Sequence, residues 1–122
     1  MIGVSITDKK VAANLRSLQR FAKTAPRKRL LDIGNELLRL SQREVPHDKG
    51  TLQNSGTVEA VGGDILVGYH TPYAHRLHEH PEYRFQKGRK GKYLTDPLYK
   101  NAKVFERHLA GDLKNDIRRA IK

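Results

Sequence analysis

The chain contains no cysteine, few acidic residues and no long apolar run. Without cysteine, its 122 residues can form neither a disulfide framework nor a thiolate metal site, so folding does not require an oxidising compartment. No apolar run approaches the roughly 20 residues that a membrane-spanning helix needs. Residues 1–6 are apolar over too short a span for a signal peptide. We therefore expect a soluble protein that is made in a cytoplasm.

The shortage of acidic residues leaves a large positive charge. Lys and Arg number 24 against 13 Asp and Glu, which gives a formal charge of +11. Such an excess favours nucleic acid, anionic lipid or an acidic protein as surroundings, although solvated helix faces explain it equally well. The apolar fraction of 37% supports one modest core, and the length fits a single domain over residues 1–122. A small core favours stabilisation by oligomerisation.

The N-terminal third has the pattern of two amphipathic helices. Apolar residues recur at helical spacing from a start at Thr7 or Asp8, which predicts a helix of about four turns; they are Val11, Leu15, Leu18 and Ala22. The run Thr24-Ala25-Pro26 ends this helix and begins the next, because proline suits a first helical turn. The second helix is predicted over residues 26–44, with an apolar stripe of Leu30, Ile33, Leu37 and Leu40. Pro46 ends it.

A β-hairpin is predicted in the middle of the chain. Residues 56–61 form one strand, Gly62 and Gly63 supply the turn, and residues 65–69 return with Ile65, Val67 and Tyr69 on one face. An isolated hairpin is weak, so it must pack on the second helix or join a larger sheet, to which residues 1–6 could add a strand.

The last part of the chain is predicted to form a long irregular loop followed by a helix. Residues 70–92 show little periodicity, which is typical of a functional loop. Thr95 or Asp96 caps the final helix, Pro97 opens it, and it continues to about Ile121 through Gly111. Its apolar stripe is Leu98, Ala102, Phe105, Leu109, Leu113, Ile117 and Ile121, and Tyr69 and Tyr99 are the tyrosines expected in the core. The predicted fold class is therefore α+β: two N-terminal helices, a small antiparallel sheet built on a central hairpin, a long irregular loop and a long C-terminal helix.

Four histidines in the loop suggest a metal site, but their spacing does not support one. His70, His75, His78 and His80 lie within eleven residues, and imidazole suits zinc. The helical metalloprotease pattern is missing, and the deaminase pattern requires cysteines. No nucleophile elbow or phosphate-binding glycine motif is present either. We expect no catalytic residue, no metal and no cofactor, and interpret these histidines as interface residues whose protonation would change assembly near pH 6.

The same loop interleaves basic and aromatic residues over positions 84–93. This composition is typical of a platform for single-stranded nucleic acid, and equally of a loop that orders against a neighbouring protein, which we favour. The candidate interface residues are Tyr73, His75, His78, His80, Tyr83, Arg84, Phe85, Lys87, Arg89 and Lys90.

Three segments, taken in order, resemble the small neck and tail-completion proteins of long-tailed bacteriophages. The first is Val45-Pro46 followed by Asp48-Lys49-Gly50-Thr51-Leu52 and Ser55, which looks like the family's "P-x-D-x-G-x-L-x-x-S". The second is a hairpin leading into Thr71-Pro72-Tyr73-Ala74, similar to the family's "PYA". The third is Tyr93-Leu94-Thr95-Asp96-Pro97-Leu98 before a C-terminal helix. The turns are assigned to Pro46, Asp48, Gly50, Gly62, Gly63 and Pro97.

The resemblance implies a structural role in a virion. Such proteins form rings, commonly hexameric, that join the head connector to the tail tube or close the tail, and they have no known catalytic residues. It implies a homo-oligomeric ring as the assembly, other neck, connector and tail-tube proteins as partners, proximity to packaged DNA, and no membrane. Location would be the virion, and the host cytoplasm during assembly. The alternatives are a small basic nucleic-acid-binding protein and, with less support, a histidine-dependent metal hydrolase.

Overall fold

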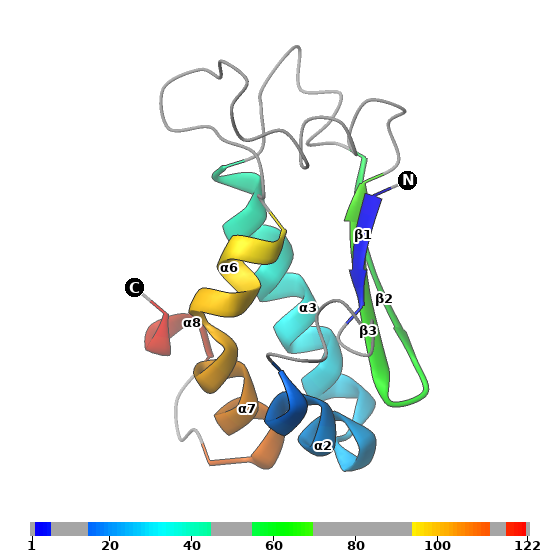
Figure 1. Cartoon of the computed structure of the whole chain (residues 1–122), viewed down its shortest axis with the longest axis vertical. Coiled ribbons are helices and arrows are strands. Elements are labelled where there is room, and N and C mark those ends of the chain that lie inside the picture. The colour runs from blue at the N-terminus through cyan, green and yellow to red at the C-terminus, as the bar shows by residue number, and fades with distance from the viewer. Residues whose placement is uncertain (1, 6–14, 45–54, 70–93, 113–116, 122) are drawn as a thin grey trace.

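The fold is α+β, as predicted, with a small antiparallel sheet packed against a layer of helices (Figure 1). The computed structural model describes residues 2–5, 15–44, 55–69, 94–112 and 117–121. Along the chain these residues form a strand, two helices, a hairpin and three further short helices.

The sheet has three strands, β1 (Ile2–Ser5), β2 (Gly56–Val61) and β3 (Asp64–Tyr69). Their order is β1-β3-β2, and both neighbouring pairs are antiparallel. The hairpin turn lies at Gly62 and Gly63, where the φ of +59° at Gly62 suits a residue without a Cβ. The predicted hairpin and the predicted N-terminal strand are both confirmed. The period-two prediction for β3 is also confirmed, since Ile65, Val67 and Tyr69 are all buried.

Two N-terminal helices follow β1, α2 (Arg16–Thr24) and α3 (Arg27–Gln42). Ala25 and Pro26 separate them with extended ψ angles of 145° and 146°, which confirms the predicted break. The predicted start of the first helix, at Thr7 or Asp8, lies outside the described residues. The second helix is two residues shorter at its C-terminus than predicted.

One core lies between the helices and the sheet. The predicted stripe of α3 is buried, and so are Leu15, Leu18 and Ala22 from the predicted stripe of the first helix. The helix α3 approaches the sheet closely at Gly34, where an added Cβ would lie 2.5 Å from Val58 Cγ1 and 2.7 Å from Ile65 Cγ1. The complete set of buried apolar residues described is Leu15, Leu18, Ala22, Leu30, Ile33, Leu37, Leu40, Ala60, Ile65, Val67, Tyr69, Leu94, Leu98, Phe105, Leu109, Ile117 and Ile121.

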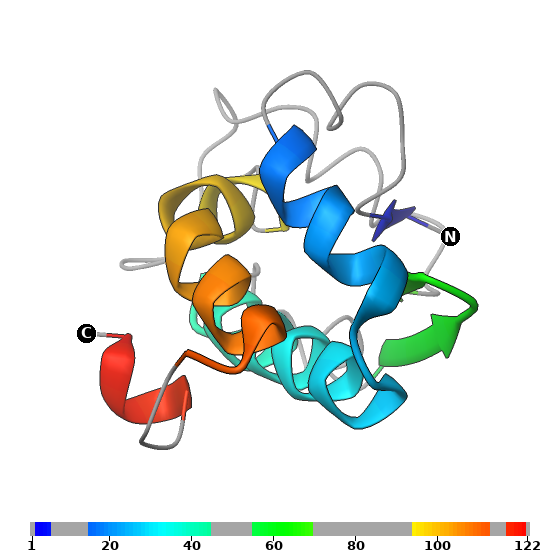
Figure 2. The ribbon, with the colours of Figure 1, turned by 90° about the horizontal axis from the view of Figure 1, so that it is seen from below.

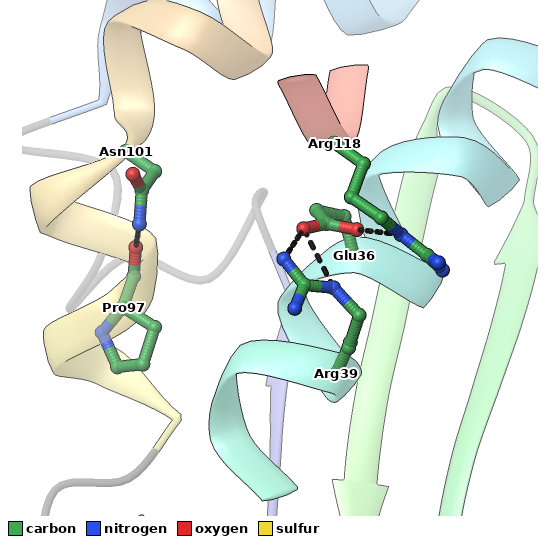
Figure 3. Close-up of polar contacts among 5 residues, drawn as sticks. All are labelled: Glu36, Arg39, Pro97, Asn101 and Arg118. Carbon is green, nitrogen blue, oxygen red and sulfur yellow. Dashed lines mark hydrogen bonds and ion pairs between the residues drawn. The ribbon is translucent and has the colours of Figure 1, made fainter. Parts of the chain in front are cut away.

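The single long C-terminal helix predicted from the sequence is wrong. Three shorter helices stand in its place, α6 (Thr95–Lys100), α7 (Ala102–Ala110) and α8 (Ile117–Ala120). Asn101 separates the first two with φ −111° and ψ 13°, and its side-chain amide donates to the carbonyl of Pro97 at 2.9 Å (Figure 3). Gly111 ends α7, because its φ of +80° is left-handed and turns the chain away.

Two smaller expectations at this end of the chain are also wrong. Pro97 neither opens α6 nor forms a turn, since the helix begins at Thr95 and Pro97 is its third residue, buried in the first helical turn. Proline fits there because the amide groups of the first turn have no partner within the helix. Tyr99 is 40% exposed rather than part of the core. Tyr69, the other tyrosine predicted to be buried, is in the core.

Candidate functional site

The ends of four elements meet at one end of the molecule. These are the C-terminal ends of α3 and β3 and the N-terminal ends of β2 and α6, all in the upper part of Figure 1. Gly56 is paired with Tyr69 across the hairpin, so β2 begins where β3 ends. A Cβ added at Gly56 would lie 2.8 Å from Leu38 Cδ1 and 3.1 Å from Gln42 Nε2, which places the last turns of α3 against this end of the sheet.

This end carries the attachment points of two segments, one that holds the turn residues Pro46, Asp48 and Gly50 and one that holds all the candidate interface residues. Residues 45–54 connect α3 to β2, and residues 70–93 connect β3 to α6. All the candidate interface residues lie outside the described residues, as do His70 and the turn residues Pro46, Asp48 and Gly50; the interface residues are Tyr73, His75, His78, His80, Tyr83, Arg84, Phe85, Lys87, Arg89 and Lys90. The described residues therefore define the end of the molecule to which both segments are attached. We call this end, formed by the ends of α3 and β3 and the starts of β2 and α6, the base.

A buried hydrogen bond joins the two elements at this base. The Tyr69 hydroxyl of β3 lies 2.9 Å from Ser41 Oγ of α3, and neither residue is exposed to solvent. Burial raises the pKa of Tyr69 to about 12, and the hydrogen bond to Ser41 opposes that rise only in part. Tyr69 thus stays neutral at physiological pH and fixes the end of α3 to the end of β3.

A small cavity of about 170 Å³ lies between the end of α3 and α6. Leu40, Arg43 and Glu44 line it from the α3 side, with Asp96, Pro97, Lys100 and Asn101 on the α6 side. Each side contributes one acidic and one basic side chain. The start of α6 therefore lies at the same end of the molecule as the end of α3 and Tyr69.

The buried carboxylate of Glu36 forms a charged cluster with two arginines (Figure 3). Glu36 is only 4% exposed and lies one turn from Arg39 on α3. Both Nε and Nη2 of Arg39 donate to Glu36 Oε1, and this hydrogen bond raises the pKa of Arg39. Arg118 of α8 approaches the other oxygen, with its Nε 3.7 Å from Glu36 Oε2. The cluster joins α8 to α3.

A second polar contact joins α3 to α7. His108 Nε2 and Asp32 Oδ2 are 2.9 Å apart, beside an open pocket of about 420 Å³. The lining combines three basic or imidazole side chains with two carboxylates: Lys28, His108 and Arg118 with Asp32 and Glu36. Because the charges nearly balance and the carboxylates already have partners, the arrangement holds helices together and offers no distinct ligand chemistry.

Within the described ranges, no three His, Cys, Asp or Glu side chains come close enough together to hold a metal ion. The histidines at positions 70, 75, 78 and 80 lie outside these ranges. Among the helices described, none combines the length and the apolar character that spanning a membrane requires.

The sequence reasoning missed the residues of both charged clusters and the partner of Tyr69. The spacing of Glu36 and Arg39 by three residues on one helix was an available signal for their pair. Nothing local pointed to Asp32 with His108 or to Ser41 with Tyr69, because these partners are 76 and 28 residues apart. Comparison with known proteins adds nothing to this picture, since no family model, no curated protein and no solved structure matches the chain.

Proposed function

We propose that this protein is a structural subunit of a long-tailed bacteriophage, assembling into a hexameric ring at the head–tail neck or at the end of the tail. The proposal rests first on the order and spacing of the three sequence segments that resemble the neck and tail-completion family. The alternatives, a nucleic-acid-binding protein that uses residues 84–93 and a metal hydrolase, depend on residues outside those described.

The observation that carries the proposal is that the candidate interface segment, residues 70–93, and the segment with the first family-like motif, residues 45–54, share one base. Residues 45–54 and 70–93 both leave from the end of the molecule that the Tyr69–Ser41 hydrogen bond holds together. Segments that start from one base can contact the same neighbouring subunit. Such a head-to-tail contact forms a ring if the rotation between successive subunits closes, and an open filament if it does not.

The sheet also favours assembly. All the described helices lie on one side of it (Figure 2), and Thr57 and Glu59 on β2 are exposed. In the described part of the chain, no strand pairs with the outer edge of β2. A sheet that the described helices cover on one side only suits a subunit whose stability increases on assembly.

The test is the mass of the particle in solution, measured by light scattering after size exclusion. A hexamer of the 13.9 kDa chain weighs about 83 kDa. We expect the wild-type chain to form a particle of that mass. Replacing Arg84, Lys87, Arg89 and Lys90 with Ala should weaken assembly and leave the circular dichroism spectrum unchanged.

A matched control removes four positive charges elsewhere. Arg27, Lys103, Arg107 and Arg119 are exposed on α3, α7 and α8, and their replacement with Ala should leave the ring intact. If both variants lose the ring equally, total charge rather than the loop governs assembly. Rings of undiminished stability in the loop variant would contradict the interface role of residues 84–90.

A further inference from the structure

The exposed side of α2 carries a basic groove that the proposed ring function does not use. Arg16, Gln19, Arg20 and Lys23 line this groove, which has a volume of about 540 Å³. Arg16, Arg20 and Lys23 follow one another at intervals of four and three residues, so they share one face of the helix. Leu18 and Ala22 occupy the opposite face and are buried. We call Arg16, Arg20 and Lys23 the α2 stripe.

The cations of the α2 stripe have no partner within the part of the chain that the structure describes. No described acidic side chain forms an ion pair with any of the three. The helix α2 itself contains no acidic residue. By contrast, the carboxylates of Asp32 and Glu36 are engaged by His108 and Arg39. The stripe is therefore free to bind an external anion, and the net charge of +11 draws polyanions toward it.

We propose that the α2 stripe binds the phosphate backbone of duplex DNA, independently of base sequence. From position 16 to position 23 an α-helix rises about 10 Å. Consecutive phosphates of one strand are spaced about 3.4 Å along the duplex axis, so the stripe spans about three of them. The guanidinium groups of Arg16 and Arg20 can each donate two parallel hydrogen bonds to a phosphate.

The lining of the groove favours phosphate over an acidic protein surface. Protein interfaces place an aromatic or arginine anchor in a desolvated pocket near their centre, whereas this groove has no aromatic residue and its Arg16, Arg20 and Lys23 side chains are exposed. The exposed aromatic residue of α2, Phe21, lies away from the stripe by helical spacing. Backbone contacts from Arg, Lys and Gln without any base-reading group give sequence-independent binding. This inference does not rest on ring formation.

The test measures binding of a fluorescently labelled 20-base-pair duplex by anisotropy, at salt concentrations from 50 to 200 mM. Each phosphate contact contributes about −0.9 to the slope of log K against log salt concentration. Relative to the wild type, the triple variant R16Q/R20Q/K23Q should reduce the magnitude of that slope by about 2 to 3. The control K28Q/K100Q/R119Q removes the same charge from exposed residues of α3, α6 and α8, and should change the slope by less than about 1.

Three results would overturn the proposal. One is equal loss of slope in the two triple variants, which would mean that net charge alone attracts DNA. Another is absence of duplex binding by the wild-type chain at 50 mM salt. The third is binding of polyglutamate as tight as that of DNA and equally sensitive to the stripe variant, which would point to an acidic protein. Thermal unfolding of both variants checks their folding, and light scattering of the stripe variant reports separately on ring formation.

Discussion

At the scale of single residues, buried polar groups connect elements that are distant in the sequence. The Tyr69 hydroxyl joins β3 to α3 through Ser41, and the Glu36 carboxylate joins α8 to α3 through Arg118. Buried polar groups of this kind are costly unless they are hydrogen-bonded, so Ser41 and Arg39, which hydrogen-bond to Tyr69 and Glu36, matter more than their contact areas suggest.

The pKa of Tyr69 predicts a loss of stability at alkaline pH. The pKa is raised from 10.0 to about 12 in the folded chain, so above pH 10 the unfolded state loses its proton first. The free energy of unfolding contributed by Tyr69 is therefore intact below pH 10. It falls by roughly 1.4 kcal/mol per pH unit between pH 10 and pH 12. Urea unfolding followed by circular dichroism at pH 9, 10, 11 and 11.5 measures this.

The variant Tyr69→Phe isolates that contribution from the other titrating groups. At pH 8 its free energy of unfolding should be about 1 to 2 kcal/mol lower than that of the wild type, because Ser41 loses its buried hydroxyl partner. The difference in free energy of unfolding between the variant and the wild type should decrease as the pH rises from 10 to 11.5. A constant difference across that range would show that Tyr69 does not titrate as described.

Glu36 gives a second prediction, which compares its two arginine partners. Arg39→Ala should destabilise the chain by about 1.5 to 3 kcal/mol, because it removes charged hydrogen bonds to a carboxylate that is 4% exposed. Arg118→Ala should cost less than about 0.5 kcal/mol, because the Arg118 side chain is 68% exposed and 3.7 Å from its partner. Chemical denaturation of both variants provides the comparison, and equal costs would contradict it.

At the scale of elements, the packing of α3 on the sheet determines the arrangement of the core. Gly34 allows this close approach, since a Cβ there would meet Val58 and Ile65 at under 3.0 Å. The apolar stripe of α3, which the sequence pattern predicted, packs against the hairpin. Gly34 is the position on α3 where a side chain does not fit.

Gly34→Ala is therefore expected to destabilise the chain although alanine favours helices. The intrinsic gain of about 1 kcal/mol should be outweighed by overpacking, for a net loss of about 1 to 3 kcal/mol. In a Val58→Ala background the same change should cost less, because the nearest contact is gone. Thermal unfolding of the four proteins of this cycle tests the coupling, and a net stabilisation by Gly34→Ala alone would refute the close approach.

The elements also show how far the sequence could predict the fold. The alternation of Ile65, Val67 and Tyr69 and the helical spacing of Leu30, Ile33 and Leu37 are local signals, and both were interpreted correctly. The C-terminal helix was not, because its apolar stripe continues across the breaks: Leu98, Phe105, Leu109, Ile117 and Ile121 are all buried, although three separate helices stand in this part of the chain. Of the other two residues of the predicted stripe, Ala102 is only partly buried and Leu113 lies outside the described residues. Periodicity therefore indicated most of the buried residues but not the interruption at Asn101.

The candidate site was less accessible to sequence reasoning than the fold. Motifs located the two segments at 45–54 and 70–93, but not the fact that they leave from one end of the molecule. That arrangement depends on the pairing of Gly56 with Tyr69 and on the contact of Tyr69 with Ser41. Both are long-range contacts that no local pattern encodes.

At the scale of the whole molecule, the α2 stripe and the base of residues 45–54 and 70–93 occupy different places. The base is formed by the ends of α3, β2, β3 and α6, and the basic stripe is on α2. Neither proposal therefore competes with the other for the same described residues. A subunit with this distribution can bind its neighbours through one end and a polyanion through a helix face.

Assembly into a hexameric ring is tested by the mass of the wild-type particle, measured by light scattering across a range of protein concentrations. We expect a discrete species near 83 kDa, which is six copies of the 13.9 kDa chain. Its mass should not increase further as the protein concentration rises. A monomer at every concentration, or open-ended growth without a limiting mass, would contradict it.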